Sequence, residues 1–283
     1  MRAKTRVLDL FCGAGLAAIG YHLAGCEVVG VDINPQPRYP FRFIEANALS
    51  ILDKDYHNFL RSSFDFVHAS PPCQQFSVST AQYRAAGKKY PDLIADTRAL
   101  LDELGLPYCI ENVPNAPIRP DIRLRGDMFG LPVWKIRHFE LGGWWSMQHS
   151  FPTKKGSQRE GDFICIYGKG GYRKHSCQPV GWRPKFDQGS VAKTWAFAMG
   201  IPSGFGPFKD TEISLGIPPA YTKHIITLWH DKKANSNAHA YAGSASSTGS
   251  TAACFSPSPM ERAYKARKWS EQGNGMDWNA KEP

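Results

Sequence analysis

One of the seven cysteines stands in a stiff loop, where its thiol could act as a nucleophile. Cys73 follows Pro71 and Pro72, which fix the backbone directly before it, and comes after the apolar run 64–69. A thiolate attacks electron-poor carbon, although a free cysteine is only slightly ionised at neutral pH. Most lone cysteines are ordinary buried side chains, so a chemical role for Cys73 depends on its neighbours.

A carboxylic acid and an amide follow at the end of a second apolar run. Glu111 and Asn112 close the run 108–113, which Pro114 stops. Because the ends of neighbouring parallel strands meet at one edge of a sheet, Cys73 and Glu111 can share a site. A thiol beside a carboxylic acid suits addition to an electron-poor ring.

A glycine turn near the N-terminus has the spacing of a nucleotide-binding loop. Gly13, Gly15 and Ala18 fit G-x-G-x-x-A directly after an apolar run, and Asp32 ends the next such run. The glycines let the backbone approach a ligand, and the acid can accept hydrogen bonds from ribose hydroxyls. The pattern predicts an adenosine-containing cofactor, such as NAD, FAD or S-adenosylmethionine. A glycine turn without a ligand is the alternative.

Alternating strands and helices would place these groups together. The predicted strands cover residues 7–11, 27–32, 64–69 and 108–113, and the predicted helices cover residues 14–23 and 93–104. This alternation predicts an α/β fold with a parallel sheet and helices on both faces. Ligands of such sheets bind beyond the carboxyl ends of the strands, where the polar groups above lie.

Composition narrows the class of protein. The 283 residues suffice for about two domains, and 42% hydrophobic with 21% charged residues argues against disorder. There is no run of 18 apolar residues, no signal-peptide core and no CxxC pair. These features predict a cytoplasmic protein with reduced thiols and no membrane span. Cys165, His175 and Cys177 are spaced too poorly to favour a metal site.

The net charge of +9 is concentrated in one part of the chain. Residues 141–195 have nine basic and three acidic side chains, 9 − 3 = +6, among many glycines and aromatic residues, whereas residues 1–140 are almost neutral. A solvated basic face is the ordinary interpretation, and a nucleic-acid contact is the alternative. The predicted segments are 1–140, a small loop-rich or β-rich unit over 141–195, a return to the first domain over 196–231, and a flexible linker with a basic tail over 232–283.

The motifs taken in order resemble those of the DNA (cytosine-5) methyltransferases. The resemblance covers about residues 5–230 and rests on residues 9–15, 31–32, 71–74, 111–113, 137–139 and 216–221. It implies a Rossmann-like, S-adenosylmethionine-dependent methyltransferase fold. It also implies a target-recognition region between Arg137 and Gly216, the interval that holds the basic segment. Double-stranded DNA is the implied partner.

The resemblance implies roles for individual residues. Cys73 would attack C6 of a flipped-out cytosine, Glu111 would hold and protonate N3, Asn112 would fix the strand end, and Arg137 would contact the base or brace the site. Asp32 would hold the ribose of the cofactor. The implied cofactor-binding residues are Asp9, Phe11, Gly13, Gly15, Asp32, Asn47 and Pro72. Lys154, Lys155, Arg173 and Lys174 would hold phosphates.

Some positions depart from the family pattern. Gln75 stands where glycine is common, and Asn47 replaces an acid near the adenine. We expect the Asn47 amide oxygen still to accept from the adenine amino group, with weakened binding. The arginine motif, Lys135 to Arg137, is thin, and no asparagine precedes the Pro pair at 218–219. With its short recognition region, the chain resembles a compact bacterial or phage-type enzyme, of the kind found in restriction-modification, acting as a monomer.

Other functions remain open. A tRNA cytosine-5 methyltransferase shares these motifs, and a non-enzymatic DNA-binding relative would account for Asn47 and Gln75. Methyltransferases acting on amino groups would have an Asp/Asn-Pro-Pro-Tyr loop, and here Cys73 stands in that place. A nicotinamide-dependent dehydrogenase would explain the glycine turn but neither the Pro-Pro-Cys-Gln nor the Glu-Asn-Val motif.

Overall fold

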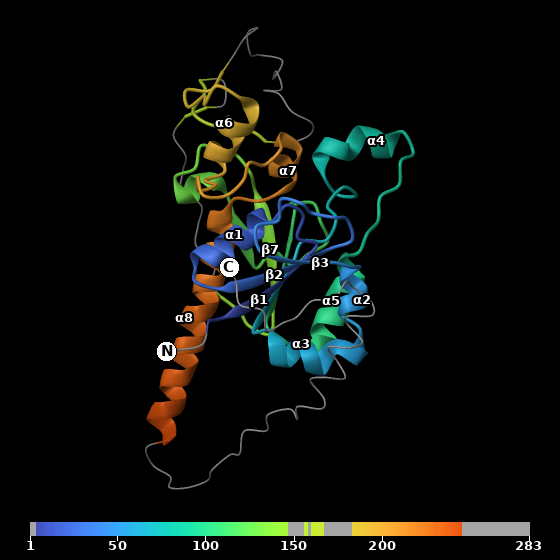
Figure 1. Cartoon of the computed structure of the whole chain (residues 1–283), viewed down its shortest axis with the longest axis vertical. Helices are drawn as coiled ribbons and strands as arrows, with labels where there is room; N and C mark the ends of the chain where they lie inside the picture. The colour runs from blue at the N-terminus through green and yellow to red at the C-terminus, as the bar shows by residue number, and fades with distance from the viewer. Residues whose placement is uncertain (1–3, 147–155, 158–159, 167–182, 245–283) are drawn as a thin grey trace.

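The computed structural model describes residues 4–146, 156–157, 160–166 and 183–244, with side chains as far as residue 235. It has one seven-stranded sheet with helices on both faces (Figure 1). The strands are β1 Arg6–Leu10, β2 Glu27–Asp32, β3 Arg42–Glu45, β4 Phe66–Ala69, β5 Tyr108–Asn112, β6 Ile122–Leu124 and β7 Arg137–Gly142. The helices are α1 Leu16–Leu23, α2 Ala48–Ile51, α3 His57–Ser63, α4 Ala81–Ala85, α5 Ile94–Leu104, α6 Val191–Ala198, α7 Asp210–Leu215 and α8 Pro219–Ser244. Three short 3₁₀ helices are η1 Lys54–Tyr56, η2 Val78–Thr80 and η3 Gly126–Phe129.

The strand order is β3-β2-β1-β4-β5-β7-β6, and the first five strands are parallel. The expected α/β fold is therefore confirmed. The expectation of an all-parallel sheet is wrong for β7 and β6, which pair antiparallel to β5 and to each other. A parallel pair needs a long crossover, usually a helix, whereas no α-helix lies between β5 and β7.

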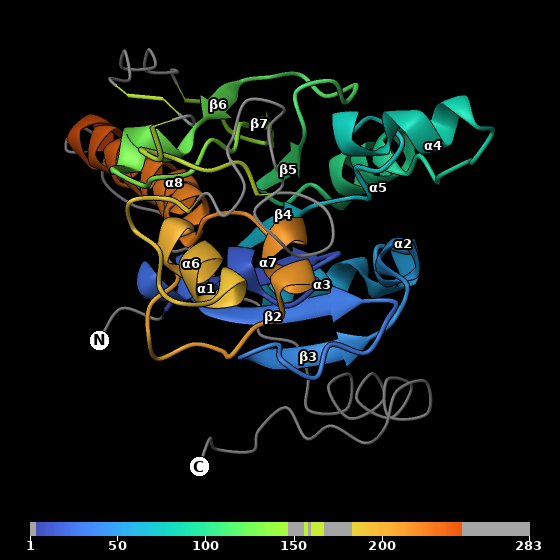
Figure 2. The ribbon, with the colours of Figure 1, turned by 90° about the horizontal axis from the view of Figure 1, so that it is seen from above.

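Two hydrophobic cores enclose the sheet from opposite sides. On one face α1 and α8 cover β1, β4 and β5 with buried side chains such as Tyr21, Ile225 and Trp229. On the other face α2, α3 and α5 pack with Ile51, Leu60 and Leu101. Figure 2 shows the two helix layers with the strands between them. The carboxyl ends of the parallel strands remain free of both layers, which leaves that edge for a site.

A third core ties the middle of the chain to the first helix. Trp195 of α6 and Ile164 are buried together with Leu16 and Ile19 of α1. The amide of Ile164 donates to the carbonyl of Pro132 at 3.0 Å. The described part of 141–195 is thus packed onto the first part of the chain.

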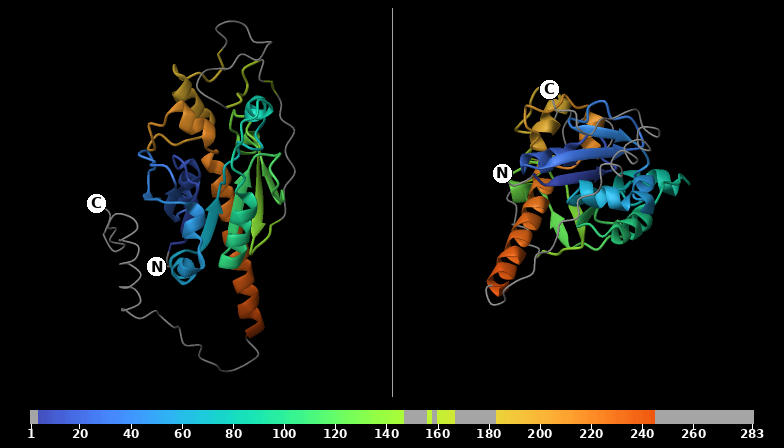
Figure 3. Two further views of the ribbon diagram at one scale, coloured as in Figure 1. Left: turned by 90° about the vertical axis from the view of Figure 1, so that its right-hand side faces the viewer. Right: turned by 60° about the horizontal axis from the view of Figure 1, so that its bottom comes forward.

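The structure moves three of the predicted segment boundaries. The boundary at 140/141 falls inside β7, and the boundary at 195/196 falls inside α6. The predicted linker begins at 232, yet α8 continues to Ser244. The Ala- and Lys-containing stretch after 231 favours helix and has no glycine before Gly243, so the helix continues through it. Figure 3 shows α8 extending beyond the sheet.

None of the helices that the structure describes is long and apolar enough to cross a membrane.

Candidate active site

The Cys73 loop is anchored to the end of β5 on one side and closed by a tight turn on the other. The side-chain amide of Asn112 donates to the carbonyl of Pro71 at 2.9 Å, and both atoms are buried. The carbonyl of Cys73 accepts hydrogen bonds from the amides of Phe76 and Ser77, at 3.0 and 2.9 Å. The predicted bracing role of Asn112 agrees with this contact. The loop therefore holds the thiol beside the ends of β4 and β5.

Glu111 forms a buried ion pair with Arg137 of the neighbouring strand. Nε of Arg137 lies 2.8 Å from Oε1 of Glu111, and the two side chains are 14% and 8% exposed. This oxygen nevertheless has no hydrogen bond of normal geometry among the described residues. Burial raises the pKa of Glu111, against the lowering effect of Arg137, a hydrogen bond from Ser70 and the charge of Lys135. The carboxyl group thus accepts a proton more readily than an exposed glutamate.

Cys73 lies within the field of the same charges. Burial raises the pKa of its thiol, Arg137 and Lys135 lower it, and Glu111 raises it again. The structure thus brings Cys73, Glu111 and Arg137 together, as the resemblance implies. The net effect is a protonated thiol at neutral pH, so these surroundings alone do not ionise the nucleophile.

Lys135 is a member of this cluster that the sequence suggested only as part of a thin arginine motif. Its Nζ donates to the carbonyl of Ser214 at 2.7 Å. Its own carbonyl accepts from the hydroxyl of Tyr221 at 2.5 Å. Burial, and then the charge of Arg137, lowers the pKa of Lys135 well below its ordinary value. These contacts bring residues 214–221 against the segment that leads into β7.

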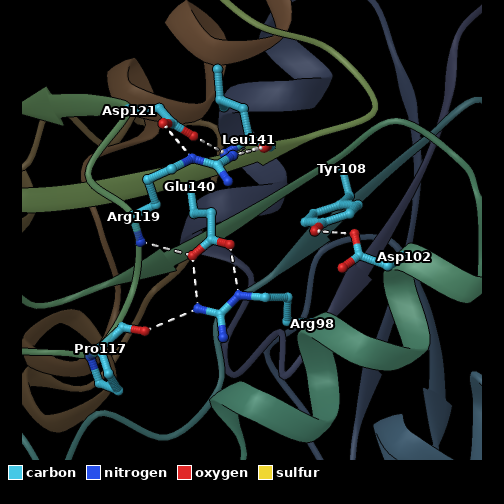
Figure 4. Close-up of polar contacts among 8 residues, drawn as sticks. All are labelled: Arg98, Asp102, Tyr108, Pro117, Arg119, Asp121, Glu140 and Leu141. Atoms are coloured by element: carbon cyan, nitrogen blue, oxygen red, sulfur yellow. Dashed lines mark hydrogen bonds and ion pairs between the residues drawn. The ribbon is translucent and has the colours of Figure 1, made fainter.

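A polar network on the far side of β7 holds that strand in place (Figure 4). Arg98 of α5 donates from Nε and Nη2 to the two carboxylate oxygens of Glu140, at 2.7 and 2.8 Å. The amide of Arg119 donates to the same carboxylate at 2.8 Å. Since Glu140 lies three residues after Arg137, the network fixes the register of the strand that carries the active-site cation.

The glycine turn forms at the ends of β1 and β2. Phe11, Gly13 and Gly15 have φ values of 57°, 51° and 89°, a left-handed backbone that costs roughly 1–3 kcal/mol for a residue such as Phe11. The amide of Gly13 donates to Oδ2 of Asp32 at 3.0 Å. A Cβ added at Gly13 would meet no atom within 4 Å, whereas one at Gly15 would come within 2.8 Å of Tyr39. The turn therefore leaves open space over Gly13.

A buried carboxyl group lies beneath this turn. Asp9 accepts a hydrogen bond from the hydroxyl of Tyr39 through Oδ2 at 3.3 Å, while Oδ1 has no partner among the described residues. Burial raises the pKa of Asp9 to about 8; the hydrogen bond from Tyr39 opposes this rise and the charge of Asp32 adds to it. The unpaired oxygen, the open turn and the acid at the end of β2 fit a ligand with amino and hydroxyl groups.

Three other positions complete this edge. Pro72 lies half-buried in the Cys73 loop. Oδ1 of Asn47 accepts from the amide of Leu49 at 2.9 Å, so the oxygen expected to receive adenine caps α2. Ile33, directly after Asp32, is 66% exposed. The sequence does not single out Ile33, whose exposure depends on the turn that follows β2.

The basic segment is only partly described. Lys154, Lys155, Arg173 and Lys174 lie outside the described residues, as do His175 and Cys177. Two described cations of this segment are paired, Arg183 with Asp187 and Lys185 with Asp162. Since these pairs use two of the three acids of the segment, its excess charge comes from the other basic residues. Within the described residues, no group of three His, Cys, Asp or Glu side chains could hold a metal.

Comparisons with known proteins bear on the family and the fold of the chain. Residues 5–117 match the family model of the C-5 cytosine-specific DNA methylases. A comparison with curated proteins gives no match. Among solved structures, Dnmt2 of S. pombe aligns with 80% of this chain and 98% of its own, at 15% identity and a TM-score of 0.54. A Spodoptera frugiperda DNMT2 variant aligns over 80% and 99%, at 11% identity and a TM-score of 0.54.

A third structure is that of a protein encoded within an E. coli prophage and described as a DNA modification methyltransferase. It is 22% identical over 49% of this chain, with a TM-score of 0.37, and the chain spans 46% of that protein's length. The resemblance drawn from the motifs is thus confirmed over residues 5–117, which match the model of the C-5 cytosine-specific DNA methylases, and the Rossmann-like fold agrees with that of the two Dnmt2 structures.

Proposed function

We propose that this protein transfers a methyl group from S-adenosylmethionine to C5 of a cytosine in DNA, through a covalent bond between Cys73 and C6. The observation that carries the proposal is the convergence of Cys73, Glu111 and Arg137 at the ends of β4, β5 and β7. A nucleophile, a proton-bearing acid and a cation at one strand edge are the groups that addition to a pyrimidine ring requires.

The neighbouring edge suits the cofactor. Asp32 at the end of β2 would hold the ribose, and the exposed side chain of Ile33 offers an apolar surface for the adenine. Gly13 leaves room for the backbone approach, and the unpaired oxygen of Asp9 could accept from the cofactor's amino group. When bound, S-adenosylmethionine supplies a methyl group made electrophilic by its sulfonium sulfur.

Cys73 and Glu111 would carry the chemistry of the base. The thiolate of Cys73 forms a bond to C6 while Glu111 gives a proton to N3, which turns the ring into an enamine with a nucleophilic C5. After C5 has taken the methyl group, it loses its proton to a base. The bond between Cys73 and C6 then breaks, and N3 returns its proton to Glu111. Arg137 stays beside both groups and offsets the negative charge that develops.

Because the pKa of Cys73 is raised, its thiol must lose a proton in the course of the reaction. Before DNA binds, burial keeps the thiol protonated although Arg137 and Lys135 lie close to it. A proton that moves from Glu111 to N3 makes the ring a better electrophile at C6, although the carboxylate left behind does not help the thiol to ionise. We propose that the thiol gives its proton to solvent as the bond to C6 forms.

DNA would reach the site with the cytosine flipped out of the duplex, at a cost of a few kcal/mol. We propose that the segment near 141–195 is the target-recognition region, because its excess positive charge can hold phosphates during that step. We further propose a monomeric, cytoplasmic enzyme. Its fold neighbours include Dnmt2 proteins, but identities of 11–15% speak only for the fold.

The experiment uses purified protein, S-adenosylmethionine with a labelled methyl group, duplex DNA and tRNA. We expect label in DNA at C5 of cytosine, and none with Cys73→Ser. Label in tRNA alone would mean that the substrate is tRNA and not DNA. Cofactor binding without transfer to either polymer would favour the non-enzymatic relative. Full transfer by Cys73→Ser would overturn the covalent mechanism.

A further inference from the structure

A row of polar side chains crosses the buried face of the sheet below the active site. In the strand register, Asp9 of β1 pairs with His68 of β4, and His68 pairs with Cys109 of β5. Because side chains alternate between faces, Ser70 and Glu111, two residues further along, lie on the same side as His68 and Cys109. The row thus runs from the core to the catalytic acid.

Hydrogen bonds connect the members of this row. Nε2 of His68 lies 2.7 Å from Oγ of Ser70, and Nδ1 lies 3.0 Å from the hydroxyl of Tyr21 and 3.2 Å from Sγ of Cys109. Continuing the register from the pair Ala69 and Ile110 places Ser70 beside Glu111, and Ser70 is among the groups that lower the pKa of Glu111. A path of polar side chains therefore leads from Tyr21 on α1 through His68 to Ser70, next to Glu111.

The chemistry of these groups fixes the direction of each hydrogen bond. His68 is fully buried, and burial lowers its pKa to about 3, so its ring is neutral and has a single N–H. An ionised Glu111 can only accept, so Ser70 must donate to it. The oxygen of Ser70 then accepts from Nε2–H of His68, and Nδ1 accepts from Tyr21 or Cys109. Each group donates once, without adding charge to the core.

The orientation of Glu111 follows from the same contacts. Oε1 has no hydrogen bond among the described residues and faces Nε of Arg137. Oε1 is buried, and the charge of Arg137 holds it in place. A hydrogen bond donated by Ser70 would add a second contact and fix the plane of the carboxyl group.

We propose that His68 and Ser70 are positioning residues for Glu111: the imidazole holds the hydroxyl of Ser70 as a donor to one carboxylate oxygen, so that the other oxygen meets N3 of the base. The inference rests on the proposed function for its catalytic consequence, but the hydrogen-bond order exists without it. Its direction is testable, because removing a donor from a carboxylate raises the pKa of that carboxyl group.

Other charged and titratable groups around Glu111 and His68 could also change the pH dependence of the reaction. Glu111 faces Arg137, Lys135 and Cys73 in addition to Ser70. These groups are left unchanged in the variants below, and Asp9, the charged neighbour of His68 in the row, is left unchanged as well.

The variants are Ser70→Ala, His68→Met and His68→Gln, the last of which keeps an N–H near the position of Nε2. Methyl transfer, which needs a protonated Glu111, falls as pH rises through the pKa of this acid. We expect Ser70→Ala and His68→Met to move that falling limb to higher pH and to reduce kcat about tenfold, with little change in KM for DNA. His68→Gln should retain most of the rate. The double variant S70A/H68M should shift the limb no further than Ser70→Ala.

A second readout needs no catalysis. The ¹⁵N chemical shifts of His68 should show a neutral ring protonated at Nε2, and Ser70→Ala or Tyr21→Phe should alter them while thermal unfolding confirms a folded chain. If the wild-type protein transfers no methyl group, the proposed function fails. The chemical shifts of His68 then test the order of the hydrogen bonds by themselves. A ring protonated at Nδ1, or a pH limb that stays in place while the rate falls, would overturn the inference. Loss of rate in His68→Gln equal to that in His68→Met would also overturn it.

Discussion

At the scale of single residues, the proposed mechanism depends on the pKa of the Cys73 thiol. Burial raises the pKa of the thiol, and the neighbouring charged groups act on it in opposite directions: Arg137 and Lys135 lower it, and Glu111 raises it. Only the thiolate reacts with alkylating agents, so the pH dependence of alkylation measures this balance directly. Cys12, Cys26 and Cys109 are buried, which makes Cys73 distinguishable in a peptide map.

We predict that alkylation of Cys73 by iodoacetamide has its midpoint at a higher pH than that of a free cysteine. Arg137→Gln should move the midpoint further up, because a stabilising cation is lost. Glu111→Gln should move it down, because a repelling carboxylate is lost. Mass spectrometry of the Cys73 peptide over a pH series checks both shifts. Equal midpoints in the three proteins would show that these side chains do not act on the thiol.

The sequence could predict the types of the reacting residues but not their protonation. Cys73, Glu111 and Arg137 belong to recognisable motifs, and the structure brings them together. The protonated thiol follows from burial, which depends on segments far away in sequence. Likewise Asn47 was expected at the adenine, but its oxygen caps α2, a local competition that Asn is prone to.

At the scale of elements, β7 matters because it carries Arg137 to the site. The strand pairs antiparallel with β5 and is fixed from α5 through Arg98 and Glu140 (Figure 4). Burial alone would raise the pKa of Glu140, but hydrogen bonds from Arg98 and the amide of Arg119 outweigh it, and the pKa lies below the ordinary 4.5. The contribution of this carboxylate to stability is thus present above about pH 4.5 and is lost as the pH falls.

We predict that Glu140→Gln lowers the free energy of unfolding by about 2 kcal/mol at neutral pH, because a buried charged acceptor of Arg98 is removed. The difference from the wild type should shrink below pH 4.5, where the wild-type carboxylate becomes protonated. Urea unfolding at several pH values checks this.

The matched control is Glu103→Gln on α5, the helix that carries Arg98; its ion pair with Lys54 is exposed, at 75% and 43% for Lys54 and Glu103. We expect a much smaller change there, because solvent screens an exposed pair. An equal loss in the two variants would contradict a special role for the network.

The longer periodic elements were predictable, and the short or polar ones were not. The run 27–32 coincides with β2, and the helix predicted over 93–104 is α5, which ends at Gly105 with a φ of 70°. β3 was missed because it lies on the edge of the sheet and has only two apolar residues, between Arg42 and Glu45. β7 has charged residues within it, one of which is Glu140, whose partner comes from a distant helix.

At the scale of the whole molecule, most of the excess positive charge lies in a segment that follows residues 1–140 in sequence. The described part of that segment nevertheless packs against them. The segment 141–195 has a charge of +6 of the total +9. Its described part shares a core with α1. The alternation of strands and helices could not reveal this contact, because it joins residues more than 100 positions apart.

We predict that changing Lys154, Lys155, Arg173 and Lys174 to Gln weakens DNA binding and flattens its dependence on salt, since each lost phosphate contact lowers the slope by about 1. Cofactor binding should stay unchanged, because those residues lie outside the glycine turn in sequence. Titrations of labelled duplex and of cofactor over a salt series provide the comparison. An equal loss of cofactor affinity would assign the segment a structural role.

The most direct test of the central claim is covalent trapping on duplex DNA that contains 5-fluorocytosine. A fluorine at C5 cannot leave as a proton, so the bond between Cys73 and C6 should persist after methyl transfer. With S-adenosylmethionine present, we predict a stable protein–DNA adduct whose digest assigns the base to Cys73, and none with Cys73→Ala. An adduct on another residue, or none in a preparation that binds both cofactor and DNA, would contradict the account.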